Sequence, residues 1–308
     1  MLEINDISWR NDKKCAVALG YFDGVHIAHQ YLIKEMEKCA EKEGLQKAIF
    51  TFTKSIKLGH KGKDIYNREQ KKEVMDKIGI ELFYSPDFSV FSSLTPEEFV
   101  KDVLVDSMGA KAVFCGENFF FGKNRRGNVR VLAQLCDKYG LEFNKVDTIE
   151  ADGEIVSSTL VRSTLEAGDM EKAGKLLGRP YAVNFEVVHG KKIGRQMGTP
   201  TINQVYPDSM CTPKPGVYIT RTTVDGVMYA SATGFGSRPT VNGTSITCET
   251  FIKGFDGDLY GRKIKVEFFK YLFGSVKFDS LKELSRMITD SANKSRIFLE
   301  NGGYLDKK

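Results

Sequence analysis

The sequence predicts an α/β domain built on a doubly wound parallel sheet, followed by a small antiparallel β-barrel and a terminal helix. Three observations carry this prediction. The first half alternates short β-rich runs with longer helical patterns, which is typical of parallel strands joined by helices. After Arg179-Pro180, short β-rich runs are separated by Gly, Pro, Asn and Asp. Helical spacing then returns at Ser280. We therefore predict two domains, residues 1–180 and 181–308.

The elements of the first domain are assigned from hydrophobic spacing. The predicted strands are 16–19, 48–52, 81–85, 112–115 and 141–146, and the predicted helices are 26–43, 68–78, 96–108 and 129–139. Ligands of such sheets bind at the carboxyl ends of the strands. This chain places the segments GYFDGVH and CGENFFFG there.

The second domain has the spacing of a small barrel or sandwich. The predicted strands are 181–189, 216–224, 246–252 and 263–272. A helix is predicted over 280–300, with Ser280 and Glu283 as a capping box.

Composition limits the classes of function. A chain of 308 residues with 41% hydrophobic and 28% charged residues is long enough for two hydrophobic cores. The net charge of +5 is spread along the chain, which suits anionic ligands such as nucleotides but gives no basic stripe for nucleic acid. No apolar run spans a bilayer and the N-terminus does not resemble a signal peptide, so we expect a cytosolic protein with no membrane partner. The six cysteines form no C-x-x-C pair, which indicates reduced, mostly buried thiols.

The first candidate site is the turn between the first predicted strand and helix. Gly20 and Gly24 let the backbone approach a phosphate, and the helix start offers free N–H groups and a positive dipole end. His26 and His29 lie three residues apart, so both would face the same anion and stabilise charge developing on an α-phosphate. Metal binding by these histidines is a weaker alternative, because no further Cys or His lies nearby in sequence.

The second candidate site is the stretch from His189 to Asn203. Its glycines at positions 190, 194 and 198 suit a backbone cradle for phosphate. Thr201 and Asn203 are two residues apart, so in an extended segment their oxygens point to one face. Two such oxygens suffice for Mg²⁺, which keeps most of its waters and binds ATP phosphates as well.

The first domain resembles FAD synthetase domains, which are nucleotidyltransferases. The turn matches G-x-F-D-G-V-H-x-G-H, except that Ala28 stands where the family usually has glycine. The segments 115–127 and 156–162 resemble two further motifs, G-x-(D/N)-F-x-F-G-K-x-R-x-G and I-S-S-T-x-x-R. The resemblance implies that the histidines and Arg162 stabilise the transferring phosphate. The nucleotide contacts that it implies are Gly20, Phe22, Asp23, Gly24, Asn118, Ser157, Ser158 and Thr159.

The second domain resembles riboflavin kinases. Residues 194–203 are similar to G-R-x-x-G-x-P-T-A-N, with Ile202 for alanine and Thr199 where an apolar residue is common. The resemblance implies that Thr201 and Asn203 meet Mg²⁺ and ATP, and that Glu249 orients the hydroxyl to be phosphorylated. The phosphate contacts that it implies are Gly190, Gly194, Arg195 and Gly198.

Three further segments of the second domain bear on this resemblance. Residues 255–261 resemble the F-D-x-D-L-Y-G loop beside the nucleotide, and 236–240 resemble a G-x-R-P-T turn. The chain departs from the family where R-x-E is usual, because Phe273 and Ser275 stand there. We expect this departure to affect the flavin side of the pocket.

Together the resemblances imply a bifunctional riboflavin kinase and FAD synthetase that uses ATP and Mg²⁺. Riboflavin, FMN and ATP would be its small-molecule substrates. Two alternatives remain open: only one half is catalytically competent, for example because Ala28 weakens adenylylation, or the protein is a flavin-binding regulator without turnover. An aminoacyl-tRNA synthetase is disfavoured, because no K-M-S-K-S-like segment or basic tRNA surface is present.

Overall fold

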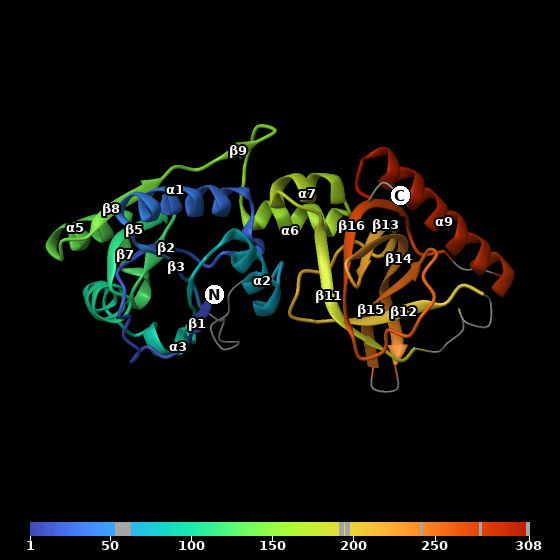
Figure 1. Ribbon diagram of the computed structural model, residues 1–308, viewed down its shortest axis with the longest axis horizontal. Coiled ribbons are helices and arrows are strands. Elements are labelled where there is room, and N and C mark those ends of the chain that lie inside the picture. Colours follow the sequence, from blue (N-terminus) through green and yellow to red (C-terminus); the bar gives the residue numbers. More distant parts are fainter. Residues whose placement is uncertain (53–62, 191–193, 195–197, 241–242, 277–278, 306–308) are drawn as a thin grey trace. The chain divides into compact units, whose positions relative to one another are not determined.

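The computed structural model describes residues 1–52, 63–190, 194, 198–240, 243–276 and 279–305 (Figure 1). The chain forms two compact units. The first contains Met1–Gly62 and Tyr66–Ser158, and the second contains Lys63–Ile65 and Thr159–Lys308. Helices α6 (Ser158–Ala167) and α7 (Met170–Leu177) thus fall almost wholly in the second unit. The functional boundary at residue 180 stays a prediction.

The first unit is built on a six-stranded sheet in the order β1-β4-β3-β2-β5-β8. Every neighbouring pair is parallel, which confirms the predicted sheet. The strands are β1 (Leu2–Ile4), β2 (Cys15–Leu19), β3 (Gln46–Phe50), β4 (Leu82–Tyr84), β5 (Ala110–Gly116) and β8 (Glu142–Val146). The edge strand β1 has only three residues and was not predicted.

Helices cover both faces of this sheet. Alternate residues of β2 belong to two separate hydrophobic clusters, because successive strand residues point to opposite faces. One cluster contains buried side chains of α1 (Ile27–Glu43) and α2 (Arg68–Ile78), and the other those of α5 (Val129–Lys138) and the helical segment before β5. The doubly wound prediction is therefore confirmed.

The segment before β5 differs from the predicted regular helix over 96–108. A single turn, α4 (Pro96–Glu98), is followed by a π-helix, η3 (Phe99–Ser107), in which the N–H of Met108 donates to the carbonyl of Val103. Sequence spacing does not separate these two hydrogen-bond patterns, because both leave an apolar face of similar width.

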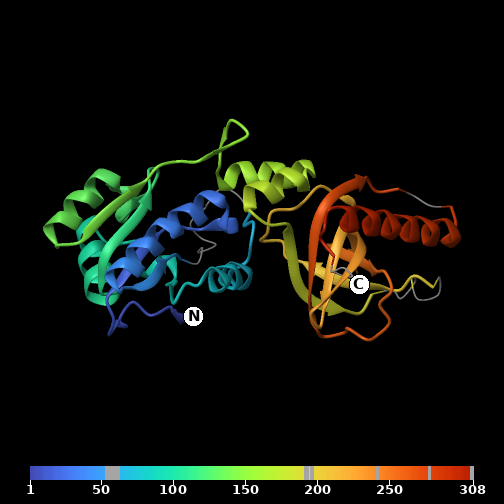
Figure 2. The ribbon, with the colours of Figure 1, turned by 45° about the horizontal axis from the view of Figure 1, so that its top comes forward.

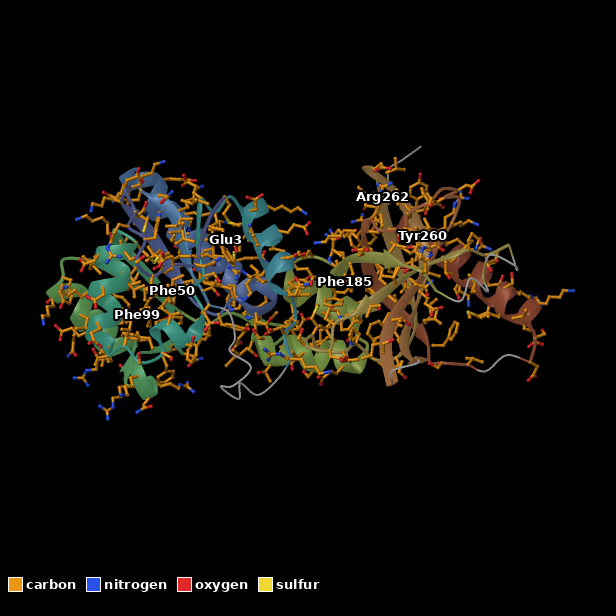
Figure 3. All side chains as sticks on the ribbon, turned by 90° about the horizontal axis from the view of Figure 1, so that it is seen from below. Glu3, Phe50, Phe99, Phe185, Tyr260 and Arg262 are labelled. Atoms are coloured by element: carbon orange, nitrogen blue, oxygen red, sulfur yellow. The ribbon has the colours of Figure 1, made fainter. Side chains whose placement is uncertain are left out.

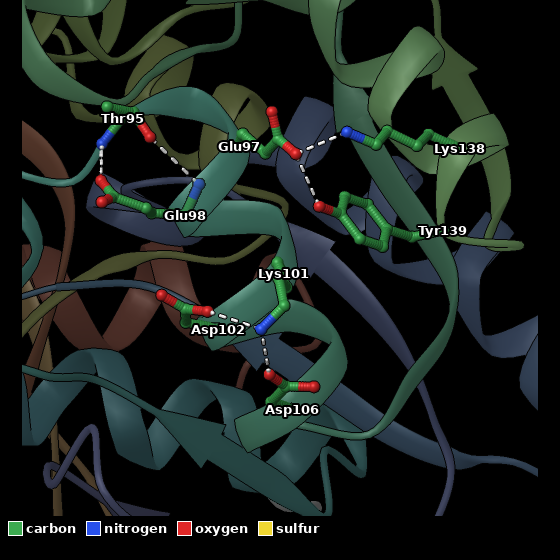
Figure 4. Close-up of polar contacts among 8 residues, drawn as sticks. All are labelled: Thr95, Glu97, Glu98, Lys101, Asp102, Asp106, Lys138 and Tyr139. Carbon is green, nitrogen blue, oxygen red and sulfur yellow. Dashed lines mark hydrogen bonds and ion pairs between the residues drawn. The ribbon is translucent and has the colours of Figure 1, made fainter.

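Figure 4 shows the polar contacts that hold this segment. Thr95 and Glu98 form a capping box, and the Glu97 carboxylate accepts from Lys138 Nζ at 2.6 Å and from the Tyr139 hydroxyl at 2.8 Å. These contacts tie the start of the segment to the end of α5.

Short elements complete the first unit. They are η1 (Asp23–Val25), α3 (Phe88–Phe91), β6 (Phe120–Phe121), η4 (Lys123–Arg125), β7 (Gly127–Asn128), β9 (Glu150–Ala151) and β10 (Glu154–Ile155). The strands among them pair as two small antiparallel ribbons, β6 with β7 and β9 with β10.

The second unit contains the predicted barrel, which is closed in the order β11-β12-β15-β14-β13-β16. Its strands are β11 (Tyr181–Val188), β12 (Thr201–Tyr206), β13 (Gly216–Val224), β14 (Val227–Thr240), β15 (Gly243–Ile252) and β16 (Lys263–Phe273). β12 and β14 were not assigned from the sequence. The interpretation of 236–240 as a turn is wrong, because these residues form the end of β14 paired with β15. The proline and glycine there do not interrupt the strand.

The barrel interior has an aromatic part and a hydroxyl part. Five buried aromatic side chains form the first, namely Tyr181, Tyr206, Tyr218, Phe235 and Phe268. The second is a chain of buried hydroxyls in the order Thr222, Ser231, Thr220, Thr233 and Thr250, with oxygen–oxygen distances of 2.8, 2.9, 2.9 and 2.8 Å. The three inner hydroxyls each bond to two hydroxyl neighbours and the two end hydroxyls to one, so every member of the buried chain has a partner.

Helix α9 (Leu281–Asn301) closes the second unit and packs on β13 and β14 (Figure 2). Ser280 caps it by accepting from the N–H of Glu283, as predicted. The reciprocal bond differs from the predicted capping box, because the Glu283 carboxylate accepts from the N–H of Asp279, one residue before the cap. The residues after the helix return to the barrel, where Arg221 donates to the carbonyl of Tyr304 at 2.6 Å.

The six cysteines are free, as expected. All but Cys39 are buried. Burial raises the pKa values of Cys15, Cys115 and Cys136 to about 12, so these thiols stay protonated and unreactive at neutral pH. Among the helices within the described ranges, none combines the length and apolar character needed to cross a bilayer.

The aromatic core of the first unit gives a stability prediction. Phe99 is 1% exposed, and its ring meets that of Phe50 edge-on at 5.1 Å (Figure 3). We expect Phe99→Ala to destabilise this unit by about 3–5 kcal/mol, because it removes a buried ring and leaves a cavity. Hydrogen exchange measured peptide by peptide on the full chain should accelerate across β2, β3 and β5 and stay unchanged in the barrel.

Phe120→Ala is the matched control, because that ring is 47% exposed. Equal acceleration by both substitutions would contradict the assignment of Phe99 to the core.

Candidate active sites

The strand order of the first unit marks where a ligand should bind. From β2 the chain proceeds outward through β3 and β4, then returns to place β5 on the other side of β2. The order therefore reverses between β2 and β5, and open α/β sheets bind ligands at the carboxyl ends of such strands. GYFDGVH follows β2 and CGENFFFG overlaps the end of β5. The structure brings these two predicted segments to one edge of the sheet.

The turn after β2 is tight and unusual in its backbone. Phe22, Gly24 and Val25 have φ of 53°, 72° and 44°, and Phe22 and Val25 are buried although such angles are costly for residues with a Cβ. A Cβ on Gly20 would lie 3.1 Å from the Phe22 ring, so glycine makes room for that ring. The turn thus holds a strained conformation at the predicted phosphate site.

The two predicted histidines lie together at the start of α1. His26 is the residue immediately before the helix and is 4% exposed, while His29 is in its first turn. Their rings stack at a centroid distance of 3.6 Å with 16° between the planes, and Phe22 packs edge-on against His29 at 5.2 Å. Both imidazoles are therefore fixed beside the helix start, whose positive dipole end favours an anion.

Further contacts secure the turn from other elements. The hydroxyl of Ser158 donates to the carbonyl of Asp23 at 3.1 Å, so one predicted serine supports the turn rather than pointing away from it. The Asp23 carboxylate is buried and accepts from the N–H of Tyr66 at 3.5 Å. Two predicted segments far apart in sequence therefore meet here.

Lys71 is a residue that sequence reasoning missed. Its side chain is 6% exposed, Nζ donates to the carbonyl of Tyr21 at 2.7 Å, and Nζ lies 4.1 Å from the centre of the Tyr21 ring. Thr51 donates to the same carbonyl at 3.0 Å. In sequence Lys71 lies in a charged stretch of a helix, which is normally a solvated face. Only the packing of α2 against η1 places it beside the turn.

The segment after β5 is shaped by glycines. Asn118 lies exposed in a turn closed by the N–H of Phe119 and the carbonyl of Gly116. Cβ atoms on Gly122 and Gly127 would lie 2.9 Å from Pro96 N and 2.6 Å from the Phe121 ring. The loop glycines thus have a packing role in addition to any approach to phosphate.

The remaining predicted residues of this motif group lie around the start of α6. Ser157 precedes the helix and is half-buried, and Thr159 is exposed. Arg162 belongs to the second unit, where its Nε donates to the carbonyl of Lys63 at 2.8 Å.

In the barrel, strand pairing brings the predicted metal and catalytic residues together. Asn203 of β12 lies directly opposite Glu249 of β15, and Thr201 lies opposite Phe251. Directly opposed residues of antiparallel strands share a face. Gln204 and Cys248, on the alternate positions, are wholly buried, so Asn203 and Glu249 share the outer face. Glu249 is not an isolated surface carboxylate, because it sits across from the P-T-x-N segment.

Glycines let the loop before β12 approach this face. A Cβ on Gly190 would lie 2.6 Å from Asn203 Nδ2, and one on Gly194 would lie 2.4 Å from the carbonyl oxygen of Thr199. Gly198 has φ of 71°, a conformation that favours glycine. Three of the four predicted phosphate contacts therefore have a structural reason to be glycine. The fourth, Arg195, lies outside the described residues.

A cavity of about 430 Å³ opens beside Thr201. It is lined by Pro200, Thr201 and Ile202 of the P-T-x-N segment, by Thr250 and Ile252 of β15, and by residues 255–260. The loop 255–260 is held against the barrel, since the N–H of Gly261 donates to the carbonyl of Val187 at 2.9 Å. Figure 3 labels Tyr260 and Arg262 at this end of the barrel.

A second cavity, of about 320 Å³, contains Glu249. Apart from this carboxylate, its walls are uncharged, and they include the departures predicted to alter the flavin side, Phe273 and Ser275. Met287 of α9 and the glycines Gly216, Gly234 and Gly236 complete much of the lining. The absence of side chains on three glycines leaves a slot that suits a flat ring.

The donor set on β12 fits a magnesium ion. Thr201 and Asn203 supply neutral oxygens on one face, and Gly190 leaves open the space next to the Asn203 amide. Within the described part of the chain, no group of three or more His, Cys, Asp or Glu side chains could hold a metal. The fit is therefore to an ion that depends on nucleotide phosphates and water for its other ligands.

Comparisons with known proteins assign both units. Residues 8–160 match the family model described as FAD synthetase, and residues 177–299 match riboflavin kinase. A Bacillus subtilis protein named bifunctional riboflavin kinase/FMN adenylyltransferase is 32% identical over 298 residues, covering 94% of this chain and 93% of that protein. An Escherichia coli K12 protein of the same name is 30% identical over 96% of each chain.

A solved structure from Streptococcus pneumoniae, titled a macrolide-efflux protein, superposes with a TM-score of 0.85 at 30% identity, over 96% of this chain and 98% of that one. The word efflux in that title describes the Streptococcus pneumoniae protein.

These findings define a class of protein in which an FAD synthetase domain precedes a riboflavin kinase domain. The chain belongs to the bifunctional riboflavin kinase/FMN adenylyltransferase family. The resemblance seen in the sequence is confirmed.

The close approach of Gly190 gives a prediction for the metal site. We expect Gly190→Ala to raise the Mg²⁺ concentration needed for half-maximal phosphorylation of riboflavin at least severalfold, because the new Cβ displaces the Asn203 amide. The measurement is initial rate against free Mg²⁺ at fixed ATP.

Gly174→Ala serves as control, because a Cβ on Gly174 would lie 3.8 Å from its nearest neighbour, the carbonyl oxygen of Arg179, and so would fit without displacement. An unchanged Mg²⁺ requirement in Gly190→Ala would argue against Asn203 as a ligand.

Proposed function

We propose that this protein phosphorylates riboflavin to FMN in its barrel and adenylylates FMN to FAD at the switch point of its parallel sheet. The observation that carries the kinase assignment is the pairing of Asn203 with Glu249. The pairing supports the assignment because the proposed metal ligand and the proposed general base share one face of the barrel. Glu249 lines one cavity and Thr201 the other.

In the kinase step, we assign ATP to the cavity beside Thr201 and riboflavin to the cavity that contains Glu249. Glu249 accepts a hydrogen bond from the ribityl 5′-hydroxyl and takes its proton as the oxygen attacks the γ-phosphorus. The bond between that phosphorus and the β–γ bridging oxygen breaks, and ADP leaves. Thr201 and Asn203 would hold Mg²⁺, which would neutralise negative charge at the phosphates.

In the adenylylation step, a phosphate oxygen of FMN attacks the α-phosphorus of a second ATP, and pyrophosphate leaves. His26, His29 and the N-terminus of α1 stabilise the negative charge that develops on the α-phosphate. Arg162 contributes a further positive charge in this proposal. Lys71, Thr51 and Ser158 act on the backbone of the turn and hold it in its strained form.

The proposal keeps the domain boundary at residue 180, directly before β11. Residues 1–180 carry out adenylylation and residues 181–308 phosphorylation. Riboflavin, FMN and ATP are the substrates.

Substitutions at the two sites should separate the two activities. We expect Glu249→Gln to lower FMN formation at least about a hundredfold, because the proton acceptor is lost, while FAD formation from supplied FMN is retained. His29→Ala should have the opposite pattern, because it removes a group that stabilises transition-state charge. Chromatography of riboflavin, FMN and FAD over time gives both rates from one sample.

Loss of both activities by either substitution would refute separate sites. Tight flavin binding by the unmodified protein without ATP consumption would instead identify a regulator without turnover.

Ala28 offers a test of the adenylylation site alone. It lies in the first turn of α1 between the two histidines, where the family usually has glycine. We expect Ala28→Gly to raise the rate of FAD formation from FMN severalfold, because it lets the α-phosphate approach the helix start. The rate of FMN formation is the internal control, and a fall in the FAD rate would show that alanine is the better residue here.

A further inference from the structure

Thr199 carries a buried polar atom that the ligand-free fold leaves unused. The residue is 4% exposed, and its Oγ1 has no hydrogen-bond partner among the residues that the structure describes. A buried hydroxyl without a partner destabilises a fold, so such a group calls for an explanation in terms of function.

The backbone fixes where this hydroxyl can go. The N–H of Thr199 donates to the carbonyl of Gly194 at 2.9 Å, and a Cβ on Gly194 would lie 2.4 Å from the Thr199 carbonyl oxygen. Threonine is also restricted at its first side-chain torsion. The hydroxyl is therefore held in place before any ligand binds.

Its place in the chain aligns it with the metal ligands. Thr199 precedes Pro200, which favours an extended conformation for Thr199, and β12 begins at Thr201. In an extended segment, residues 199, 201 and 203 face the same way and are spaced by about 7 Å. With residue 199 extended in this way, its side chain would continue the row formed by Thr201 and Asn203. A polyphosphate lying along this row would meet all three groups in turn.

We propose that Thr199 is an additional phosphate-binding residue of the kinase site, whose hydroxyl donates a hydrogen bond to a phosphate oxygen of the nucleotide held by Thr201 and Asn203. This inference rests on the kinase function proposed above. It explains why a buried hydroxyl is tolerated at a position where an apolar side chain would suit the free protein better.

Gln204 Oε1 in β12 is a second buried polar atom, and phosphate binding does not explain it. Gln204 Oε1 is also without a partner in the described part of the chain, but its amide nitrogen is fixed by the carbonyls of Phe185 and Ile264 at 2.7 Å each. The remaining oxygen is an acceptor only and cannot bind an anion. It faces the barrel interior, on the side opposite to Asn203.

The test is Thr199→Val in the full chain, because valine keeps the shape and removes the hydroxyl. We expect the Kd for ADP at the kinase site to rise about tenfold, as for the loss of one hydrogen bond to a charged group. The KM for ATP in FMN formation should rise similarly, and the KM for ATP in FAD formation should stay unchanged. Thr199→Ser should retain wild-type affinity.

Thermal unfolding of the ligand-free protein supplies the second readout. We expect the midpoint of Thr199→Val to be unchanged or higher, because a buried group without a partner is removed. The control is Thr223→Val, at a half-buried position of β13, which should leave ADP affinity unchanged.

Two results would overturn the proposal. The first is an unchanged ADP affinity in Thr199→Val, and a lower midpoint in that variant would then assign the hydroxyl a structural role. The second is an affinity loss that disappears in EDTA, which would make Thr199 a metal ligand instead. If Glu249→Gln leaves FMN formation intact while ADP binding still depends on Thr199, the kinase mechanism fails and the phosphate contact stands.

Discussion

The pairing of β12 with β15 is the constraint on which the kinase site depends. It puts Asn203 opposite Glu249 and leaves the alternate residues, Gln204 and Cys248, inside the barrel. A shift of one residue would exchange the two faces, burying the carboxylate and exposing the core. Closure of the barrel forbids such a shift, because every strand is paired on both sides. The same hydrogen bonds that stabilise the fold therefore set the distance between the proposed base, Glu249, and the proposed metal ligand, Asn203.

The two sites achieve precise placement by different means. The proposed adenylylation site lies at an interruption, where β2 ends and α1 begins, and its geometry comes from a strained turn held by Lys71, Thr51 and Ser158. The proposed kinase site lies along uninterrupted strands, and its geometry comes from side chains in register, with glycines that let neighbouring backbone come close. Backbone N–H groups and a helix start suit the first, whereas neutral side-chain oxygens suit the second.

Much of the fold and part of the candidate sites could be predicted from the sequence, because the patterns that indicate them are local. The parallel sheet, the capped terminal helix and the glycine-rich stretches follow from spacing and turn chemistry over short windows. Lys71 could not be predicted, since a lysine in a charged helix is buried only when another element packs over it. The opposition of Asn203 and Glu249 was equally inaccessible, because strand register depends on pairing between distant segments. Likewise, the π-helix before β5 and the strand end at 236–240 are tertiary outcomes that override local preference.

The chain of five hydroxyls inside the barrel has a consequence for how this protein can vary. A hydrogen-bonded chain has two directions, and all of its protons must reverse together when the direction changes. Replacing Thr220 alone by an apolar residue would leave Ser231 and Thr233 each short of one partner. Replacing all five hydroxyl side chains at once would leave no hydroxyl without a partner. The path from a hydroxyl interior to an aliphatic one therefore crosses destabilised intermediates. The interior of this barrel can therefore change only through several substitutions together, whereas an exposed position of its outer face such as Val205 can change alone.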